Sequence, residues 1–282
     1  MRGVALVAHH ERATAREHAL QARQWCADRD IPFWMTPDDA AALDLADRAS
    51  VRPISEADLV LSLGGDGTML RSVRLLEGAA VPLLGVNLGS LGYLTEVEPD
   101  LLTDALDRFV GGKQTGRWHL DERMMLDVSV NEERVGRALN EAVVEKAESG
   151  HTVRLLARID GEPFTYYAAD GLIVATPTGS TAYSLSARGP VVSPHHRALL
   201  LTPVSPHMLF DRTLVLDPTQ TIEVQVSGHR KADLALDGRF VQTLGDGEVV
   251  RCTSSSATAR VVRFGEFHFH QILKAKFGLQ DR

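Results

Sequence analysis

Two patterns of apolar residues divide the chain near residue 115. Before it, short apolar runs such as Val4–Ala8, Leu59–Leu63 and Val81–Val86 alternate with stretches of helical spacing such as 12–29 and 101–110. A short, nearly continuous apolar run is typical of a strand buried on both faces. The alternation of such strands with helices predicts an open parallel sheet with helices on its faces.

After residue 115 the chain changes to short strand-like runs separated by Gly, Pro or Asn, and helical spacing is scarce. This pattern predicts a β-rich domain, built as two packed sheets. Ser254–Ser256 is interpreted as a polar loop, and a last amphipathic stretch, Phe267–Phe277, as a terminal helix. The predicted strand-like runs are 124–130, 134–146, 152–160, 164–176, 198–204, 213–216, 221–226, 233–236, 248–252 and 258–264.

These patterns predict an α/β amino-terminal domain with an open parallel sheet, followed by a β-rich, sandwich-like carboxyl-terminal domain. We expect the α/β domain over residues 1–115 and the β-rich domain over 116–265. Residues 266–282 are expected to pack back on the first domain. The chain's 282 residues, of which 44% are hydrophobic, are enough for two domains of this size.

Charge and cysteine content exclude several classes of protein. The net charge of −7 argues against a non-specific nucleic-acid binder, which needs a basic surface. The two cysteines, Cys26 and Cys252, lie far apart, so a disulfide scaffold is excluded and a reducing compartment is favoured. No signal peptide and no membrane span are expected, which predicts a cytoplasmic protein. The scattered histidines lack zinc spacing, and no metal site is assigned to them.

The segment 64–68, Gly-Gly-Asp-Gly-Thr, follows the buried run 59–63 and precedes a helix expected over 69–77. Backbone N–H groups beside a helix N-terminus bind anions, so phosphate is a natural guest. Asp66 in the middle repels phosphate, which indicates a task such as binding a metal or accepting a hydroxyl proton. The alternative is a tight turn in which Asp66 caps the helix. Neither a P-loop nor a dinucleotide fingerprint of glycines occurs.

A second polar segment, 176–184, reads Thr-Pro-Thr-Gly-Ser-Thr-Ala-Tyr-Ser and follows the apolar run 172–175. Small hydroxyl residues around a glycine suit a polar ligand wrapped by backbone, although an ordinary capped helix fits equally well. Asn140-Glu141 by itself is a surface dipeptide, and Asp237-Gly238 by itself is a turn.

Taken together, these segments resemble the NAD kinase family in order and spacing, over about residues 3–275. The segment 64–68 alone also resembles diacylglycerol kinases, sphingosine kinases and phosphofructokinases, whereas 176–184 is specific. The resemblance implies transfer of phosphate from ATP to the 2′-hydroxyl of the adenosine ribose of NAD, with Mg²⁺ or another divalent ion on the triphosphate. It also suggests a homodimer or homotetramer. The net charge and the short apolar runs predict neither nucleic acid nor membrane as a partner.

The resemblance also implies roles for single residues. Asp66 matches the proposed general base, and the phosphate loop for ATP comprises Gly64, Gly65, Gly67 and Thr68. The residues implied in binding NAD or NADP are Asp66, Gly67, Arg71, Asn140, Glu141, His151, Asp170, Thr181, Ala182, Tyr183, Ser184 and Ser186.

The chain departs from the family pattern at Ala168, Arg188 and Arg239, and His151 stands where a basic residue is usual. These departures leave open the choice between NAD⁺ and NADH and between ATP and other donors. Two other functions remain open at this point. One is a lipid kinase that shares the glycine loop, and the other is a non-catalytic sensor that binds NADP.

Overall fold

The computed structural model describes residues 1–10, 13–89, 92–112 and 117–279, and the chain divides into two compact units. The first unit comprises Met1–Glu122 and Ala259–Arg282, and the second comprises Arg123–Thr258. The boundaries fall inside two long strands, β5 (His119–Val130) and β16 (Val249–Arg263). Residues 116–122 and 259–265, assigned to the β-rich domain from the sequence, therefore fall in the first unit.

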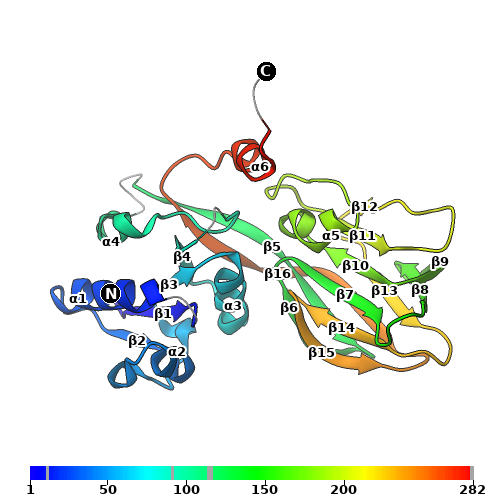
Figure 1. Ribbon diagram of the computed structural model, residues 1–282, viewed down its shortest axis with the longest axis horizontal. Helices are drawn as coiled ribbons and strands as arrows, with labels where there is room; N and C mark the ends of the chain where they lie inside the picture. The colour runs from blue at the N-terminus through cyan, green and yellow to red at the C-terminus, as the bar shows by residue number, and fades with distance from the viewer. Residues whose placement is uncertain (11–12, 90–91, 113–116, 280–282) are drawn as a thin grey trace. The chain divides into compact units, whose positions relative to one another are not determined.

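The first unit contains the expected open parallel sheet (Figure 1). Its order is β2 (Phe33–Met35), β1 (Val4–Ala8), β3 (Leu59–Gly64), β4 (Pro82–Asn87) and the last part of β16, and all neighbours are parallel. Helices α1 (Ala13–Ala27) and α4 (Leu102–Val110) bury apolar residues in one core with alternate strand residues. Helix α3 (Asp66–Leu76) also packs on β1, β3 and β4. The remaining short elements are α2 (Pro37–Ala42), η1 (Ala46–Arg48), η2 (Ile54–Glu56) and η3 (Pro99–Leu101).

Two helix starts differ from the sequence prediction. Helix α3 begins at Asp66, three residues before the expected Met69, because Gly65 takes an extended conformation and acts as the N-cap without a side chain. The interpretation in which Asp66 caps the helix is therefore wrong. Helix α2 was not expected, although Thr36 caps it and Pro37 opens it. At six residues it is too short to show helical periodicity.

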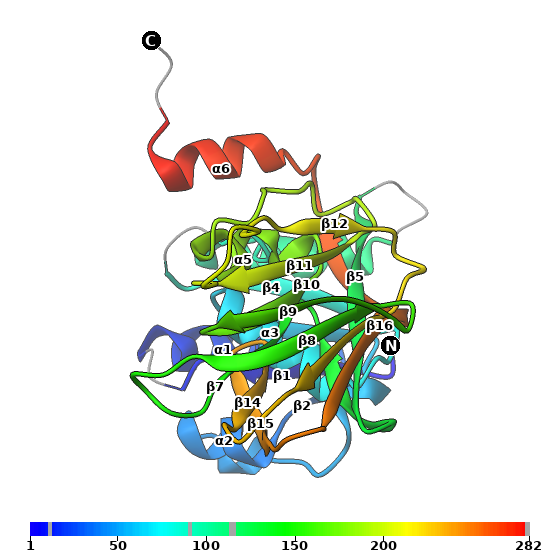
Figure 2. The ribbon, with the colours of Figure 1, turned by 90° about the vertical axis from the view of Figure 1, so that its right-hand side faces the viewer.

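The second unit consists of two packed sheets, as predicted (Figure 2). One sheet is antiparallel throughout. The other comprises the first part of β16, β13 (Ile222–Val226), β8 (Val153–Ile159) and β9 (Glu162–Ala169), together with β5 and β6 (Glu133–Ala138). Buried residues from both sheets, such as Leu155 and Leu172, form one core. The antiparallel sheet has the order β12 (Leu214–Leu216), β11 (Leu199–Val204), β10 (Gly171–Ala175), β7 (Glu141–Lys146), β14 (Ala232–Leu236) and β15 (Arg239–Leu244).

The strand predictions were wrong at several places. Strand β15 had no predicted counterpart, and Ser254–Ser256 lie inside β16 rather than in a loop. Ser255 is buried there and accepts a hydrogen bond from Arg137, so tertiary contacts keep the strand intact through a polar stretch. The runs 134–146 and 164–176 are each two strands, which separate at 139–140 and at Asp170, and the runs 248–252 and 258–264 belong to the single strand β16.

Helix α6 (Phe269–Phe277) belongs to the first unit. Its Phe269 ring lies 6.1 Å from the ring of Tyr93, and Lys276 Nζ lies 4.6 Å from the same ring. None of its residues is buried. Among the helices of the described ranges, none has the length and apolar character needed to cross a membrane.

Candidate functional site

The segment 64–68 lies at the carboxyl end of β3, where ligands of open α/β sheets bind. A side chain on Gly64 would overlap Thr68, so packing within the chain explains this glycine. A Cβ on Gly65 or Gly67 would meet no atom within 4 Å. These two glycines therefore face open space, and a ligand approaching the loop meets bare backbone. The loop borders a cavity of about 510 Å³, lined by Ala8, His9, His10, Gly65, Gly67, Thr68 and Arg71.

Asp66 is the first residue of α3, and its carboxylate binds backbone groups outside the helix. One oxygen accepts the N–H of Tyr93 and the other accepts the N–H of Leu94, both at 2.9 Å. These bonds attach the first turn of α3 to the segment that follows β4. A carboxylate has about four acceptor sites, so each oxygen keeps capacity for a further donor.

Arg71 lines the cavity, but its charge already has a partner. Its guanidinium donates two hydrogen bonds to Asp39, at 2.6 and 3.1 Å, and the Asp39 side chain is fully buried. His10 Nε2 lies 2.9 Å from the same carboxylate. The resemblance implies Arg71 in binding the dinucleotide, and in the structure Asp39 offsets much of the positive charge of Arg71. Sequence reasoning missed Asp39 and His10, because a buried acid cannot be recognised from its neighbours.

Replacing Asp39 by Asn is expected to destabilise the first unit. The amide loses the charge that balances Arg71 and leaves a partly buried cation without its partner. Breaking such a pair costs about 3 kcal/mol of unfolding free energy. Urea unfolding measures the loss, with Asp38→Asn as the matched control because Asp38 is the exposed neighbour on the same helix. Equal stability of the two variants would contradict the role given to Asp39.

In the second unit, Asp237 organises the start of β7. Its carboxylate accepts the backbone N–H groups of Leu139, Asn140 and Glu141 at 2.8, 2.7 and 3.1 Å. Asp237-Gly238, interpreted as a turn, therefore also fixes the dipeptide Asn140-Glu141. Sequence reasoning missed this function, because the partners lie almost a hundred residues apart.

The segment after β10 is joined to the same dipeptide. The N–H of Thr176 donates to the carbonyl of Asn140 at 2.9 Å, and Thr176 Oγ1 donates to the carbonyl of Leu139 at 2.6 Å. Gly179 lies so close that a Cβ would overlap the Asn140 carbonyl and lie 2.8 Å from its Cα. The short helices η5 (Thr178–Thr181) and α5 (Tyr183–Ser186) follow. The structure thus brings two sequence-predicted segments together.

Glu141 is a buried carboxyl group with an unused acceptor. Its exposure is 5%, and its Oε2 has no hydrogen-bond partner among the described residues. Burial, with the charge of Asp237, raises its pKa from 4.5 to about 8, although the N–H of Tyr183 acts in the opposite direction. The hydroxyl of Thr178 is also buried without such a partner. Unsatisfied buried polar atoms are costly, so both suit a ligand with hydroxyl groups.

The raised pKa of Glu141 predicts a pH-dependent stability. The folded state holds the proton of the Glu141 carboxyl group more tightly than the unfolded state does. The unfolding free energy that this group contributes is therefore fully present below pH 4.5 and declines as the pH rises toward 8. The slope is at most about 1.4 kcal/mol per pH unit. Glu141→Gln is expected to lose less unfolding free energy than the wild type between pH 5 and pH 8, measured by urea unfolding. Parallel pH curves would contradict the buried-carboxyl assignment.

Asp170, Lys146 and Tyr183 form the other part of this region. Lys146 Nζ donates to Asp170 at 2.6 Å. Desolvation, followed by the charges of Glu145 and Asp170, raises the pKa of Tyr183, while the charge of Lys146 acts in the opposite direction. Its side chain is 37% exposed and free to contact a ligand. Exposed His151 lines a small cavity with the basic residues Lys146, Arg230 and Lys231 and the acidic Glu148.

The remaining predicted residues differ in exposure. Thr181 and Ala182 are half-buried and Ser186 is exposed, whereas Ser184 is buried with its Oγ 2.9 Å from Thr202 Oγ1. The hydroxyl of Ser184 therefore faces the sheet. Arg188, one of the departures from the family pattern, has φ 66°, a conformation that favours glycine.

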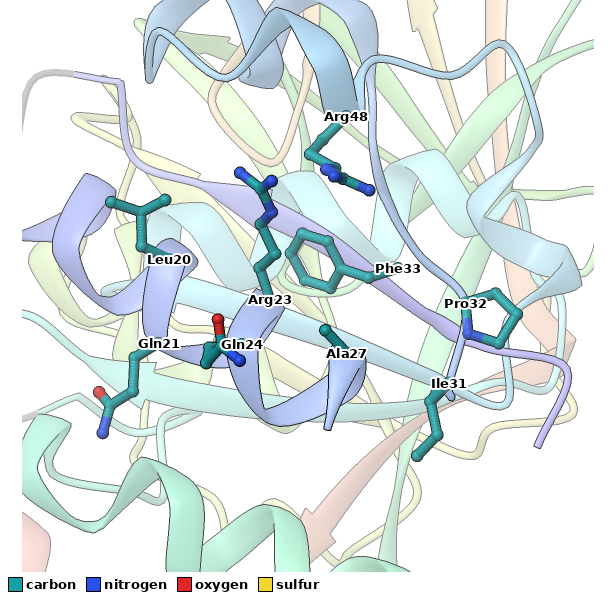
Figure 3. A pocket seen from close by; sticks show the side chains of 9 residues that line it. All are labelled: Leu20, Gln21, Arg23, Gln24, Ala27, Ile31, Pro32, Phe33 and Arg48. Carbon is teal, nitrogen blue, oxygen red and sulfur yellow. The ribbon is translucent and has the colours of Figure 1, made fainter. Parts of the chain in front are cut away.

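A further cavity, of about 870 Å³, lies between α1, β2 and η1 in the first unit (Figure 3). Arg23 and Arg48 lie beside the ring of Phe33 at this cavity, and both arginines pair with Asp47. None of the residues predicted from the sequence to form the site lines it.

The chain matches known proteins along nearly its whole length. The ATP-NAD kinase N-terminal domain matches residues 4–114, and the ATP-NAD kinase C-terminal domain matches residues 139–264. The NAD kinase of Heliobacterium modesticaldum is 39% identical over 97% of both chains. The NAD kinase of Moorella thermoacetica is also 39% identical, over 98% of this chain and 89% of its own.

Two solved structures share the fold. Yeast NADH kinase complexed with NADH has a TM-score of 0.89 and 25% identity, covering 100% of this chain and 89% of its own. An NAD kinase from Archaeoglobus fulgidus in complex with ATP has a TM-score of 0.73 and 25% identity, covering 98% and 97%. The matches cover both units, including the segment 64–68 and the segments around Asn140 and Thr176. The chain therefore belongs to the ATP-NAD kinase family.

Proposed function

We propose that this chain is an NAD kinase, which transfers the terminal phosphate of ATP to the 2′-hydroxyl of the adenosine ribose of NAD. The observation that carries the proposal is Asp66, a carboxylate beside two glycines that face open space, in a chain that matches NAD kinases over both units. Relatives named NAD kinase, and neighbours solved with NADH and with ATP, support both substrates.

The first unit would bind the phosphates and supply the base. The backbone of Gly65, Gly67 and Thr68 at the start of α3 suits the phosphates of ATP. Asp66 would accept the 2′-hydroxyl proton as the new bond to phosphorus forms. A loose phosphoryl-transfer transition state demands little deprotonation in advance, so an ordinary carboxylate is sufficient. Arg71, already paired with Asp39, would act mainly as an oriented hydrogen-bond donor rather than as a full counter-charge.

The second unit would bind the dinucleotide. The unused acceptor of Glu141, with Asn140, suits the paired hydroxyls of a ribose. Tyr183 offers an exposed aromatic face, with Thr181 and Ala182 beside it and Ser186 one turn on. Asp170, held by Lys146, suits an amide or hydroxyl donor of the ligand, and His151 lines a small cavity with the same lysine.

A divalent ion, Mg²⁺ by preference, would accompany the triphosphate. Mg²⁺ binds carboxylate and phosphate oxygens, and Asp66, which lies between the two open glycines in the sequence, carries a carboxylate of that type. Bound there, the ion would neutralise charge on the phosphates. A homodimer or homotetramer and a cytoplasmic location stay predictions, which light scattering and cell fractionation test.

The deciding experiment is a coupled assay of NADP formation from NAD and ATP with Mg²⁺. NADH and polyphosphate are run as competing substrates, and diacylglycerol as an alternative acceptor. NADP that appears only with ATP and the divalent ion supports the proposal. Phosphorylation of diacylglycerol in place of NAD would assign a lipid kinase. Tight NADP binding by calorimetry without any product would assign a sensor.

A further inference from the structure

A single peptide group joins the proposed base to a buried arginine. The N–H of Leu94 donates to Asp66 Oδ1 at 2.9 Å, and the carbonyl of the same peptide group, which belongs to Tyr93, accepts a hydrogen bond from Arg263 at 3.1 Å. The cation therefore lies at the carbonyl end of the peptide and the anion at its N–H end. Both charges polarise the peptide in the same sense, which strengthens both hydrogen bonds.

Arg263 holds the neighbouring residues as well. Its guanidinium also donates to the carbonyl of Thr95 at 3.2 Å and to Glu96 at 2.9 Å. The N–H of Tyr93 donates to the second oxygen of Asp66 at 2.9 Å. The segment 92–95 is thus held by its carbonyls on one side and by its N–H groups on the other. A side chain at Gly92 would overlap the Asp66 carboxylate, which shows how closely the two are packed.

The cost of burying Arg263 indicates a specific task. Its side chain is 1% exposed, and besides Glu96 it pairs with Asp121, also 1% exposed, at 3.3 Å. The ring of Phe267 covers its guanidinium at 4.5 Å. Burying such a charge stabilises a protein little compared with apolar packing. A planar group with five fixed donors can, however, hold two carbonyls and two carboxylates at once.

We propose that Arg263 is a positioning residue for Asp66, acting through the peptide group between Tyr93 and Leu94. It fixes the carboxylate in the first turn of α3 and limits its rotation, so that its remaining acceptor capacity points in one direction. The inference rests on the proposed function, because it assumes that Asp66 accepts the proton of the substrate hydroxyl. Nothing in the sequence marks Arg263, which lies 197 positions from Asp66 in the numbering.

The test is Arg263→Lys, which keeps the buried charge but has one ammonium group for four acceptors. We expect kcat for NADP formation to fall roughly 10- to 100-fold, because small misplacements of a reacting group cost that much. The KM values for ATP and NAD should change by less than about threefold. Arg260→Gln is the matched control, since Arg260 lies on the same strand and forms an ion pair with half-exposed Glu122. Its kcat should stay at the wild-type value.

A double-mutant cycle separates positioning from general structural support. If Arg263 acts through Asp66, Arg263→Lys should cost almost nothing further in the Asp66→Asn background. Unchanged kcat in Arg263→Lys, or losses that multiply in the double variant, would overturn the inference. If the lysine variant fails to fold, Asp121→Asn/Arg263→Gln removes both charges of the buried pair, and the same outcomes apply.

Amide hydrogen exchange tests whether Arg263 holds the peptide group between Tyr93 and Leu94, without a measurement of activity. Exchange at Leu94 should accelerate in Arg263→Lys and stay unchanged in Arg260→Gln. Unaltered exchange at Leu94 in Arg263→Lys would contradict the role of Arg263 in holding this peptide group. A wild-type chain that forms no NADP would instead refute the proposed function, and the exchange at Leu94 would still decide the structural part of the inference.

Discussion

Asp66→Asn is expected to remove most NADP formation while NAD binding is kept. An amide cannot accept the proton of the ribose hydroxyl, and loss of a general base costs about 10²- to 10⁴-fold in rate. Asn keeps an acceptor for only one of the N–H groups of Tyr93 and Leu94, so the neighbouring segment is expected to loosen slightly. Steady-state kinetics with NAD and ATP measure the loss, and calorimetry with NAD measures the binding.

Thermal unfolding of the same variant shows whether the loss is chemical. A melting temperature close to the wild-type value, together with unchanged NAD affinity, assigns the effect to the missing base. Turnover near the wild-type rate would take the role away from Asp66. In that case, the two hydrogen bonds to the segment after β4 would be its main task.

Gly179→Ala is expected to damage the dinucleotide site in the second unit. The added methyl group would overlap the backbone of Asn140, which cannot move aside as a flexible side chain can. Either the segment 176–181 or the start of β7 must then shift, and that shift separates Glu141 from its neighbours. Overpacking of this kind costs about 1–3 kcal/mol of stability, and we expect the KM for NAD to rise at least about tenfold.

Gly245→Ala is the matched control for Gly179→Ala. Gly245 lies in the same unit, and a Cβ there would make an ordinary contact of 3.6 Å with Glu248. Its KM for NAD should match the wild type. If Gly179→Ala bound NAD as tightly as this control, the close approach of Gly179 to Asn140 would have no function in binding.

Much of the fold followed from local patterns. Short apolar runs such as Val4–Ala8 and Leu59–Leu63 were correctly predicted as strands, and in the structure every residue of these runs is buried. The predictions failed where local signals were weak or misleading. The serines at 254–256 stay in a strand because their neighbours on both sides pair, and Arg239–Leu244 pairs with β14 despite polar residues.

The candidate site was predictable only in part. Segments such as 64–68 stand out because glycines and an acid interrupt an apolar pattern. Asp39 and Asp237 gave no such signal, because each acts on residues far away in the sequence. Asp39 lies in a short helix that the sequence did not predict, and Asp237-Gly238 has the sequence of a common turn. Their contribution to the site depends on which distant N–H or guanidinium groups the fold brings to them.

Asp39 also constrains how the sequence can vary. Its carboxylate receives hydrogen bonds from the backbone of Ala8 and from the side chains of Thr36 and Arg71, and His10 lies beside it. Three separate stretches of the chain, at 8–10, 36 and 71, thus share one anion. Side chains that share a partner are energetically coupled, so a replacement at one of these positions changes which residues the others tolerate. Among relatives, we expect this group to be inherited together or lost together.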